Sequence, residues 1–202
     1  MSLLGKKVFG KKVLGKAIVL LLAAAASFGA ISVYAATQPA ANTSTVQVIS
    51  TLGGKFTFDL TQGFEANPLP PGDSASGTAG AMGTMYTNQA SKTVVIVAEN
   101  VRTDGVQVKD NDSEFLDGAV ESFLQKQSTA LPDFKKLDEK KLTIKGLGLR
   151  QIDSIATMGG GKTLGTTLLA GFGSRSLVIQ IISRADDQSG HTAVVKQIIG
   201  GE

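Results

Sequence analysis

One short segment of the chain has the residue types of a phosphate-binding loop. Residues 159–163 read GGGKT and contain the Gly-Lys-Thr triplet that holds phosphates in nucleotide-binding proteins. That pattern needs another glycine five residues before the last glycine, and Ala156 occupies the position. It also needs a helix after the loop, whereas residues 163–170 alternate as a strand does. We therefore predict a hairpin turn here and no nucleotide site.

His191 is the only histidine, and the chain contains no cysteine. Without cysteine there is no disulfide, no thiolate metal site, no cysteine nucleophile and no cysteine for a lipid anchor. With a single histidine we expect neither a Ser-His-Asp triad nor a multi-histidine zinc site. We expect His191 to lie on the polar side of a surface helix, in contact with solvent.

The acidic residues suggest helix starts more than metal ligands. Asp110, Asp112 and Glu114 alternate as the first ligands of a calcium loop do, but the sixth position of such a loop lacks its glycine. Asp112 or Ser113 is instead expected to cap a helix, and residues 186–187 (DD) to begin another. The sequence therefore predicts no catalytic, cofactor-binding or metal-binding residue.

The N-terminal residues predict export. Five lysines precede an apolar run at residues 17–26, which continues weakly to the small-residue site at 33–35. These are the parts of a secretory signal peptide, so we expect cleavage after Ala35. An uncleaved inner-membrane anchor at 17–35, facing the periplasm, is the alternative, since its 19 residues approach the roughly 20 that span a bilayer.

The basic character of the whole chain comes from this N-terminal segment. Residues 1–35 hold five of the 20 basic residues and none of the 17 acidic ones, which leaves 15 against 17 and a net charge of −2. We therefore expect no nucleic-acid partner. The predicted organisation is a signal peptide at 1–35, a flexible linker at 36–52 and a single domain at 53–200.

Residues 135–184 predict four strands, near 140–144, 149–155, 163–170 and 176–182, joined by glycine-rich turns. Connections this short allow only antiparallel neighbours, so the four form a meander. The last strand is the most apolar and should lie centrally. A helix to about residue 199 should follow, with Ala193, Val194, Ile198 and Ile199 near its core face.

The first part of the domain adds strands and a second helix. A strand at 55–60 should point Phe56, Phe58 and Leu60 into the core, and an apolar strand is expected at 92–98 after a short one at 84–88. Residues 66–83 are rich in Pro and Gly and predict a surface loop. An amphipathic helix should begin near Asp112 and end at Pro132, with an apolar face of Phe115, Leu116, Ala119, Val120, Phe123, Leu124 and Gln127.

Three short stretches, in this order and spacing, resemble the DcrB family of bacterial envelope proteins: residues 54–58 (GKFTF), 151–155 (QIDSI) and 185–188 (ADDQ). The resemblance covers about residues 53–199. It implies an α+β fold of the Mog/PsbP-like kind, an α/β/α sandwich with an antiparallel sheet between helices. It also implies no catalytic residues and an envelope role linked to lipoprotein maturation and to adsorption of certain phages. Well-known members carry a lipid on a cysteine, which this chain lacks.

These observations lead to one main expectation of function and two others. The main one is a periplasmic, non-enzymatic accessory or interaction protein of the cell envelope, whose partners are envelope proteins or inner-membrane maturation factors. The second is a periplasmic small-ligand binder with a cleft between the sheet and the 66–83 loop. The third is a hydrolase built from scattered carboxylates.

Overall fold

The computed structural model describes residues 46–72, 80–102 and 105–200. Their largest element is a seven-stranded sheet in which every neighbouring pair is antiparallel. Its strands, in spatial order, are β3 (Phe64–Pro68), β4 (Ala81–Asn88), β5 (Thr93–Val101), β9 (Arg175–Arg184), β8 (Gly161–Phe172), β7 (Leu147–Met158) and β6 (Lys135–Ile144).

The predicted meander is confirmed. Strands β6 to β9 are neighbours in sequence order, and the apolar strand β9 lies in the middle of the sheet. Each strand is longer than the sequence predicted, because two-residue turns connect them. The turn between β7 and β8 has positive φ at Gly159 (58°) and Gly160 (80°), which suits a tight hairpin turn. The GGGKT segment therefore forms the hairpin turn and the first three residues of β8, so a strand and not a helix follows the turn, as expected.

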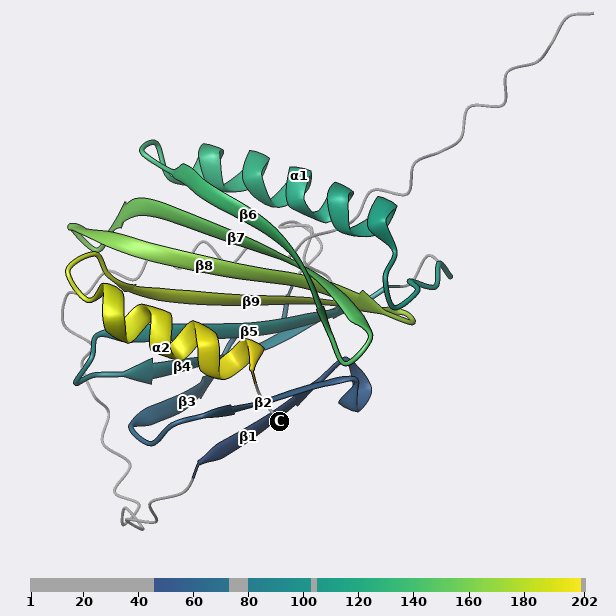
Figure 1. Cartoon of the computed structure of the whole chain (residues 1–202), viewed down its shortest axis with the longest axis horizontal. Helices are drawn as coiled ribbons and strands as arrows, with labels where there is room; N and C mark the ends of the chain where they lie inside the picture. The colour runs from purple at the N-terminus through teal and green to yellow at the C-terminus, as the bar shows by residue number, and fades with distance from the viewer. Residues whose placement is uncertain (1–45, 73–79, 103–104, 201–202) are drawn as a thin grey trace, which may run out of the picture.

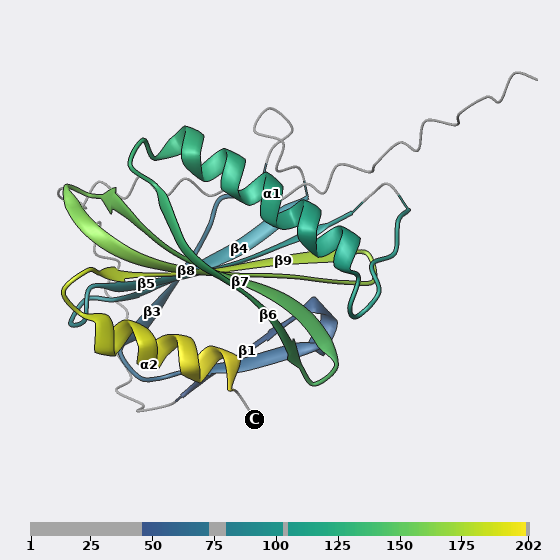
Figure 2. The ribbon, with the colours of Figure 1, turned by 45° about the horizontal axis from the view of Figure 1, so that its top comes forward.

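Helices cover both faces of the sheet, as Figures 1 and 2 show. Helix α1 (Ser113–Ala130) lies on one face. Helix α2 (Gln188–Ile199) lies on the other, beside a ribbon of β1 (Gln47–Thr51) and β2 (Phe56–Leu60) joined by the 3-10 turn Leu52–Gly54. The predicted α+β class, with an antiparallel sheet between helices, is confirmed.

Strands β1 and β3 and the start of β4 lie in ranges for which the sequence predicted no strand. Residues 36–52 were expected to be linker, yet β1 pairs with β2 along its whole length, so the folded part begins by Gln47. Residues 66–83 were expected to be loop, yet 66–68 complete β3 and 81–83 begin β4. Pro68 is compatible with β3 because that strand is at the sheet edge. Residues 73–79 lie outside the described part.

Helix α1 matches its prediction closely. Asp112 caps it by accepting a hydrogen bond from the Phe115 N–H at 3.0 Å, and the helix ends two residues before Pro132. Leu116, Ala119, Val120, Phe123 and Gln127 are buried. Ala119, Val120 and Phe123 belong to an apolar cluster that also contains Ile152, Leu169 and Val178 of the sheet. Phe115 and Leu124 are half-buried.

The opposite face holds the larger core. Phe56, Phe58 and Leu60 of β2 are buried there, as predicted. In α2 the buried side chains are His191, Val195 and Ile198, while Ala193 is exposed. The predicted core face of α2 is therefore correct for Ile198 and wrong for Ala193.

The predicted signal peptide lies outside the described residues. Among the helices that the structure does describe, neither is long and apolar enough to cross a membrane.

Candidate functional site

The site begins with His191, which is not where the sequence placed it. The side chain is only 8% exposed and lies under the first turn of α2, against the sheet. Its position has a simple cause: His191 precedes Val195 by four residues and Ile198 by seven, so all three occupy one stripe of the helix. That spacing was visible in the sequence. The expectation of a solvated histidine is wrong because a polar residue was assumed to face outward.

Both ring nitrogens of His191 contact hydroxyl groups of the sheet. Nε2 lies 2.9 Å from Thr166 Oγ1 on β8, and Nδ1 lies 3.1 Å from Ser183 Oγ on β9. Thr166 donates to Asp153 Oδ1 on β7 at 2.8 Å, and Ser183 lies 3.4 Å from Thr93 Oγ1 on β5. A row of polar groups thus crosses four strands of the sheet. We call these five side chains the His191 network.

The hydrogen-bond donors in the network determine which ring nitrogen of a neutral His191 carries the hydrogen. Thr166 has one hydroxyl hydrogen and gives it to the Asp153 carboxylate, so toward His191 it can only accept. His191 therefore donates from Nε2, and Nδ1, free of hydrogen in a neutral ring, accepts from Ser183. The arrangement satisfies a neutral imidazole completely.

Electrostatics favour the neutral state of His191. Burial lowers the pKa of His191 below its ordinary value, against the opposing attraction of the Asp153 and Asp187 carboxylates. The loss of water around the ring destabilises the imidazolium. The attraction of the two carboxylates, which do not contact the ring directly, is too weak to offset this. His191 is therefore a neutral side chain near pH 7.

Asp153 connects the network to the surface. Lys140 Nζ on β6 contacts its Oδ2 at 2.8 Å, and the Gln151 side-chain amide donates to both of its oxygens. Burial would raise the pKa of Asp153, but the hydrogen bonds from Lys140, Gln151 and Thr166 outweigh it and hold the pKa below its usual range. Asp153 is therefore charged, and it orients Thr166 toward His191.

Ser183, His191, Thr166 and Asp153 form the sequence of groups that nucleophilic catalysis uses, with a threonine inserted between histidine and aspartate. No triad was expected because the chain has a single histidine, yet one histidine is enough for such a series when the fold brings a hydroxyl to each ring nitrogen. The geometry limits what the network can do. Ser183 is 1% exposed, so a substrate cannot reach its hydroxyl without displacement of α2.

The other acidic residues that the sequence singled out act in local contacts. Asp110 pairs with Lys55 at 2.6 Å, and Asp187 caps α2 by accepting from the Gly190 N–H. Asp186 pairs with Arg184. Among the described residues no group of three or more His, Cys, Asp or Glu side chains is placed to hold a metal ion.

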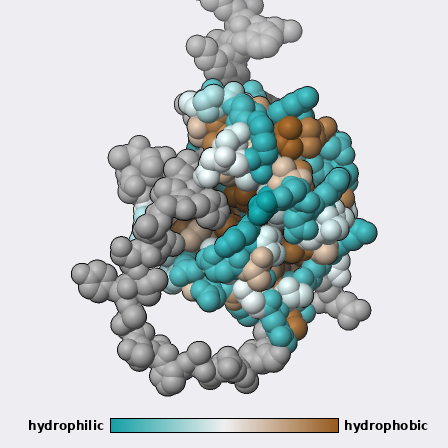
Figure 3. Space-filling model, turned by 90° about the vertical axis from the view of Figure 1, so that its left-hand side faces the viewer, coloured by the Kyte–Doolittle hydropathy of each residue, from teal (hydrophilic) through white to brown (hydrophobic). Residues whose placement is uncertain are grey.

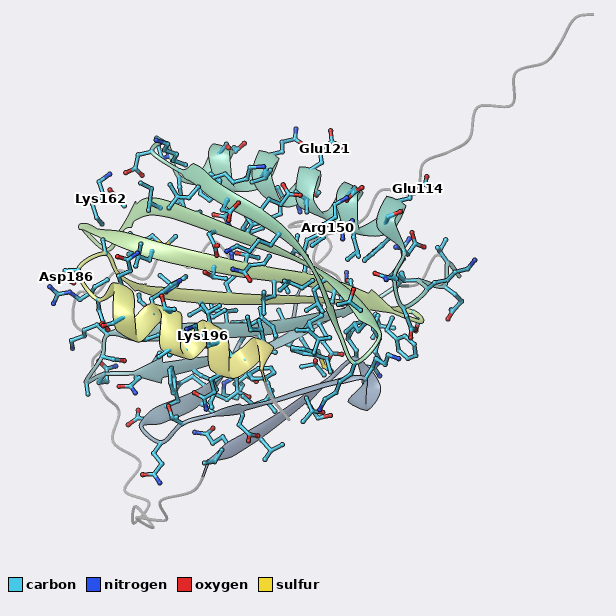
Figure 4. The ribbon with its side chains drawn as sticks, in the orientation of Figure 1. Glu114, Glu121, Arg150, Lys162, Asp186 and Lys196 are labelled. Carbon is cyan, nitrogen blue, oxygen red and sulfur yellow. The ribbon has the colours of Figure 1, made fainter. Side chains whose placement is uncertain are left out.

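Lys162 of the GGGKT segment binds a carboxylate of the chain itself. Its Nζ contacts Asp133 Oδ2 at 2.6 Å, and Asp133 also accepts from the backbone and hydroxyl of Thr157. Figure 4 shows Lys162 and Asp186 at the opposite end of the molecule from Glu114. These labelled charges are thus dispersed over the surface.

Comparison with known proteins identifies a fold. No protein-family model and no curated protein matches the sequence. The solution structure of cyanobacterial PsbP (CyanoP) from Synechocystis sp. PCC 6803 matches with a TM-score of 0.54 and 8% identity, over 80% of this chain and 95% of that one. The chain is thus an α+β protein with a PsbP-like fold.

Two further solved structures show weaker likeness. A protein of unknown function, PA94 from Pseudomonas aeruginosa, matches with a TM-score of 0.42 and 13% identity, over 75% of this chain and 92% of that one. LpqN, involved in cell envelope biogenesis of Mycobacterium tuberculosis, matches with a TM-score of 0.46 and 10% identity, over 80% of this chain and 84% of that one.

Proposed function

We propose that this protein is a non-enzymatic interaction protein of a bacterial cell envelope, and that it acts in the periplasm through its surface. The observation that supports this most is the burial of Ser183 and His191 under α2. A nucleophile that no substrate can reach argues against catalysis by Ser183 and is consistent with action through binding. The predicted signal peptide ending at Ala35 and the resemblance to the DcrB family support the location.

The His191 network has a structural role in this proposal. It joins α2 to strands β5, β7, β8 and β9 by hydrogen bonds that an apolar interface would not provide. Buried polar groups that are fully paired favour one packing arrangement over alternatives. The network therefore fixes the position of α2, and through it the neighbouring β2, so that the outer surface is held in one shape.

In-cell crosslinking tests the proposal. Tagged protein is crosslinked in its own cells, and the captured proteins are identified by mass spectrometry, with the Ser183→Ala variant beside the wild type. An interaction protein captures envelope proteins or inner-membrane maturation factors, and Ser183→Ala, once its circular dichroism matches that of wild type, captures the same set. If the protein were an enzyme that depends on Ser183, the Ser183→Ala variant would keep its fold and lose its activity in the cell.

The intact mass of the native protein tests the location. Loss of residues 1–35 is expected. If those residues remain attached, the protein is held at the inner membrane by residues 17–35 and faces the periplasm, which was the alternative expectation.

A feature of the surface favours a second candidate, a binder of small ligands. Figure 3 shows a hollow with hydrophobic side chains at its floor and hydrophilic side chains beside it. A thermal-shift screen with envelope lipids tests this candidate, because a ligand at 100 times its dissociation constant adds about 2.7 kcal/mol to the free energy of unfolding.

A further inference from the structure

The described residues contain four strands with an unpaired edge. The large sheet ends at β3 and β6, and β1 and β2 pair only with each other. An unpaired edge presents backbone N–H and C=O groups to any other extended chain, so soluble proteins usually protect such edges. The four edges are protected to very different degrees.

Three of the edges carry the usual protection. Strand β6 contains Lys135, Lys136, Lys140 and Lys141, and its register shifts between Lys136 and Asp138. Lysines and irregular register both oppose the addition of another strand. Strand β3 carries Glu65 and ends at Pro68, which has no N–H to donate. Strand β2 carries Asp59 and lies beside α2 (Figure 1).

Strand β1 has none of these features. Residues 46–51 read VQVIST and contain no charge, no proline and no glycine, and four of the six are β-branched. Val46 is 51% exposed and Val48 is 69% exposed, so the outer side of the strand is apolar. In an antiparallel pair, alternate residues direct their backbone groups away from the partner strand. The free edge of β1 thus offers both hydrogen bonds and apolar contacts.

The edge is also held rigidly. At one end Gln47 Nε2 donates to the Phe64 carbonyl at 2.5 Å, and just beyond the other end the Leu52 N–H donates to Glu99 Oε1 at 2.7 Å. Ile49 and Thr51 point inward and are buried. A strand fixed at both ends loses little further conformational entropy when another strand pairs with it.

We infer that the free edge of β1 is a docking site for an extended, uncharged segment of a partner protein, which adds as a further strand of the ribbon. This inference rests on the proposed interaction function and names its surface. Side chains opposite Val46 and Val48 contact them directly, so the segment carries apolar or β-branched residues at alternate positions.

Two other occupants fit the edge less well. A second copy would contribute only the five residues of β1 to the pairing, against roughly 20–30 residues a side in a standard interface. The chain's own residues 36–45 are rich in alanine and contain Pro39, a composition that strands disfavour. A short strand of another protein needs neither a large interface nor those residues.

The test uses an end-blocked, fluorescein-labelled peptide of alternating valine and threonine, six residues long, titrated with the purified protein and followed by fluorescence anisotropy. A second peptide carries N-methyl groups on alternate residues, which removes the backbone donors along one edge. We expect saturable binding of the first peptide and at least about tenfold weaker binding of the second, because strand addition depends on main-chain hydrogen bonds.

Three variants locate the site. Val48→Lys places a charge on the edge and is expected to weaken binding at least about tenfold, because edge lysines oppose strand addition. Val48→Thr keeps a β-branched, uncharged side chain and is expected to stay within about twofold of wild type. Met82→Lys is the matched control, since Met82 is 70% exposed on β4, and is also expected to stay within about twofold.

The inference is overturned by no binding at about 1 mM protein, by equal affinity for the N-methylated peptide, or by equal loss in Val48→Lys and Met82→Lys. It is also overturned if sedimentation shows a dimer that Val48→Lys dissociates, since the occupant is then a second copy. None of these results alters the crosslinking outcome, so a failure here is distinct from a failure of the proposed function.

Discussion

Each face of the sheet buries one basic side chain under a helix, and the two are held in opposite ways. Under α1, Arg150 keeps its charge: its Nε and Nη2 lie 3.0 and 2.7 Å from Asp117 Oδ1, at the solvent side of the helix. Under α2, His191 is neutral and contacts only hydroxyl groups. A guanidinium cannot give up its proton in a protein, whereas an imidazole can, so one needs a carboxylate and the other does not.

The difference predicts how each face responds to change. The α1 face combines an apolar cluster with a permanent ion pair, so its stability should vary little between pH 5.5 and 7.5. The α2 face depends on a histidine that is neutral in the folded state and that takes up a proton in the unfolded chain within that range. Variants that remove one of these contributions at a time test whether the two faces are separable.

The largest effect is expected from Phe123→Ala in α1. Phe123 is fully buried, and its loss leaves a cavity between the helix and the sheet, so the free energy of unfolding should fall by about 4 kcal/mol. The loss should be the same at pH 7.5 and pH 5.5. Urea denaturation followed by circular dichroism measures both values. The control is Leu137→Ala on β6, an exposed position expected to cost under about 0.5 kcal/mol.

A smaller loss is expected from Asp117→Ala. The variant leaves the Arg150 guanidinium buried without its carboxylate, which should cost about 2 kcal/mol. Asp186→Ala removes the carboxylate of another arginine pair, but Arg184 is exposed, so that loss should be much smaller. Equal losses of unfolding free energy in the two variants would show that the burial of Arg150 does not increase the contribution of its ion pair to stability.

The same pair has a signature in acid. The hydrogen bond from Arg150 holds the pKa of Asp117 below its ordinary value. A carboxyl group with a lowered pKa in the folded state stabilises the protein above its unfolded pKa, and that stability is lost as the pH falls through the folded value. Wild type should therefore lose more stability than Asp117→Ala below about pH 4, as denaturation at pH 4.5 and pH 3 would measure.

The sequence predicted the α1 face better than the α2 face for a physical reason. The apolar residues of α1 recur at helical spacing, and the strands β6 to β9 alternate between glycine-rich turns, so local pattern determines both. The His191 network instead depends on register. Asp153 faces Thr166 only because β7 and β8 pair as they do, and no local pattern contains that information.

Strand β1 shows a second limit of local pattern. It has five residues and follows a polar, alanine-rich segment, so nothing near it marks a strand. Its conformation comes from pairing with β2 and from the burial of Ile49, both of which are tertiary effects. The surface that we propose for binding was therefore absent from the sequence-based prediction.

The smallest effect is the one that tests the α2 face most directly. Burial lowers the pKa of His191 in the folded state, so the unfolded chain takes up a proton more readily. Stability from a group of this kind is present above its unfolded pKa of about 6.5 and is lost as the pH falls below it. Wild type should therefore lose stability between pH 7 and pH 5.5, by at most about 1 kcal/mol.

His191→Gln separates that proton uptake from other contributions. Glutamine offers one donor and one acceptor to the hydroxyls of Thr166 and Ser183 and does not titrate, so the variant should lose some stability at pH 7 and little more at pH 5.5. The carboxylates do not interfere, because Asp153 and Asp117 have lowered pKa values and titrate below this window. If variant and wild type lose the same amount between the two pH values, the histidine is already charged or accessible in the folded state. The claim that His191 is neutral and shielded from water in the folded state, in contrast to the charged Arg150, would then be wrong.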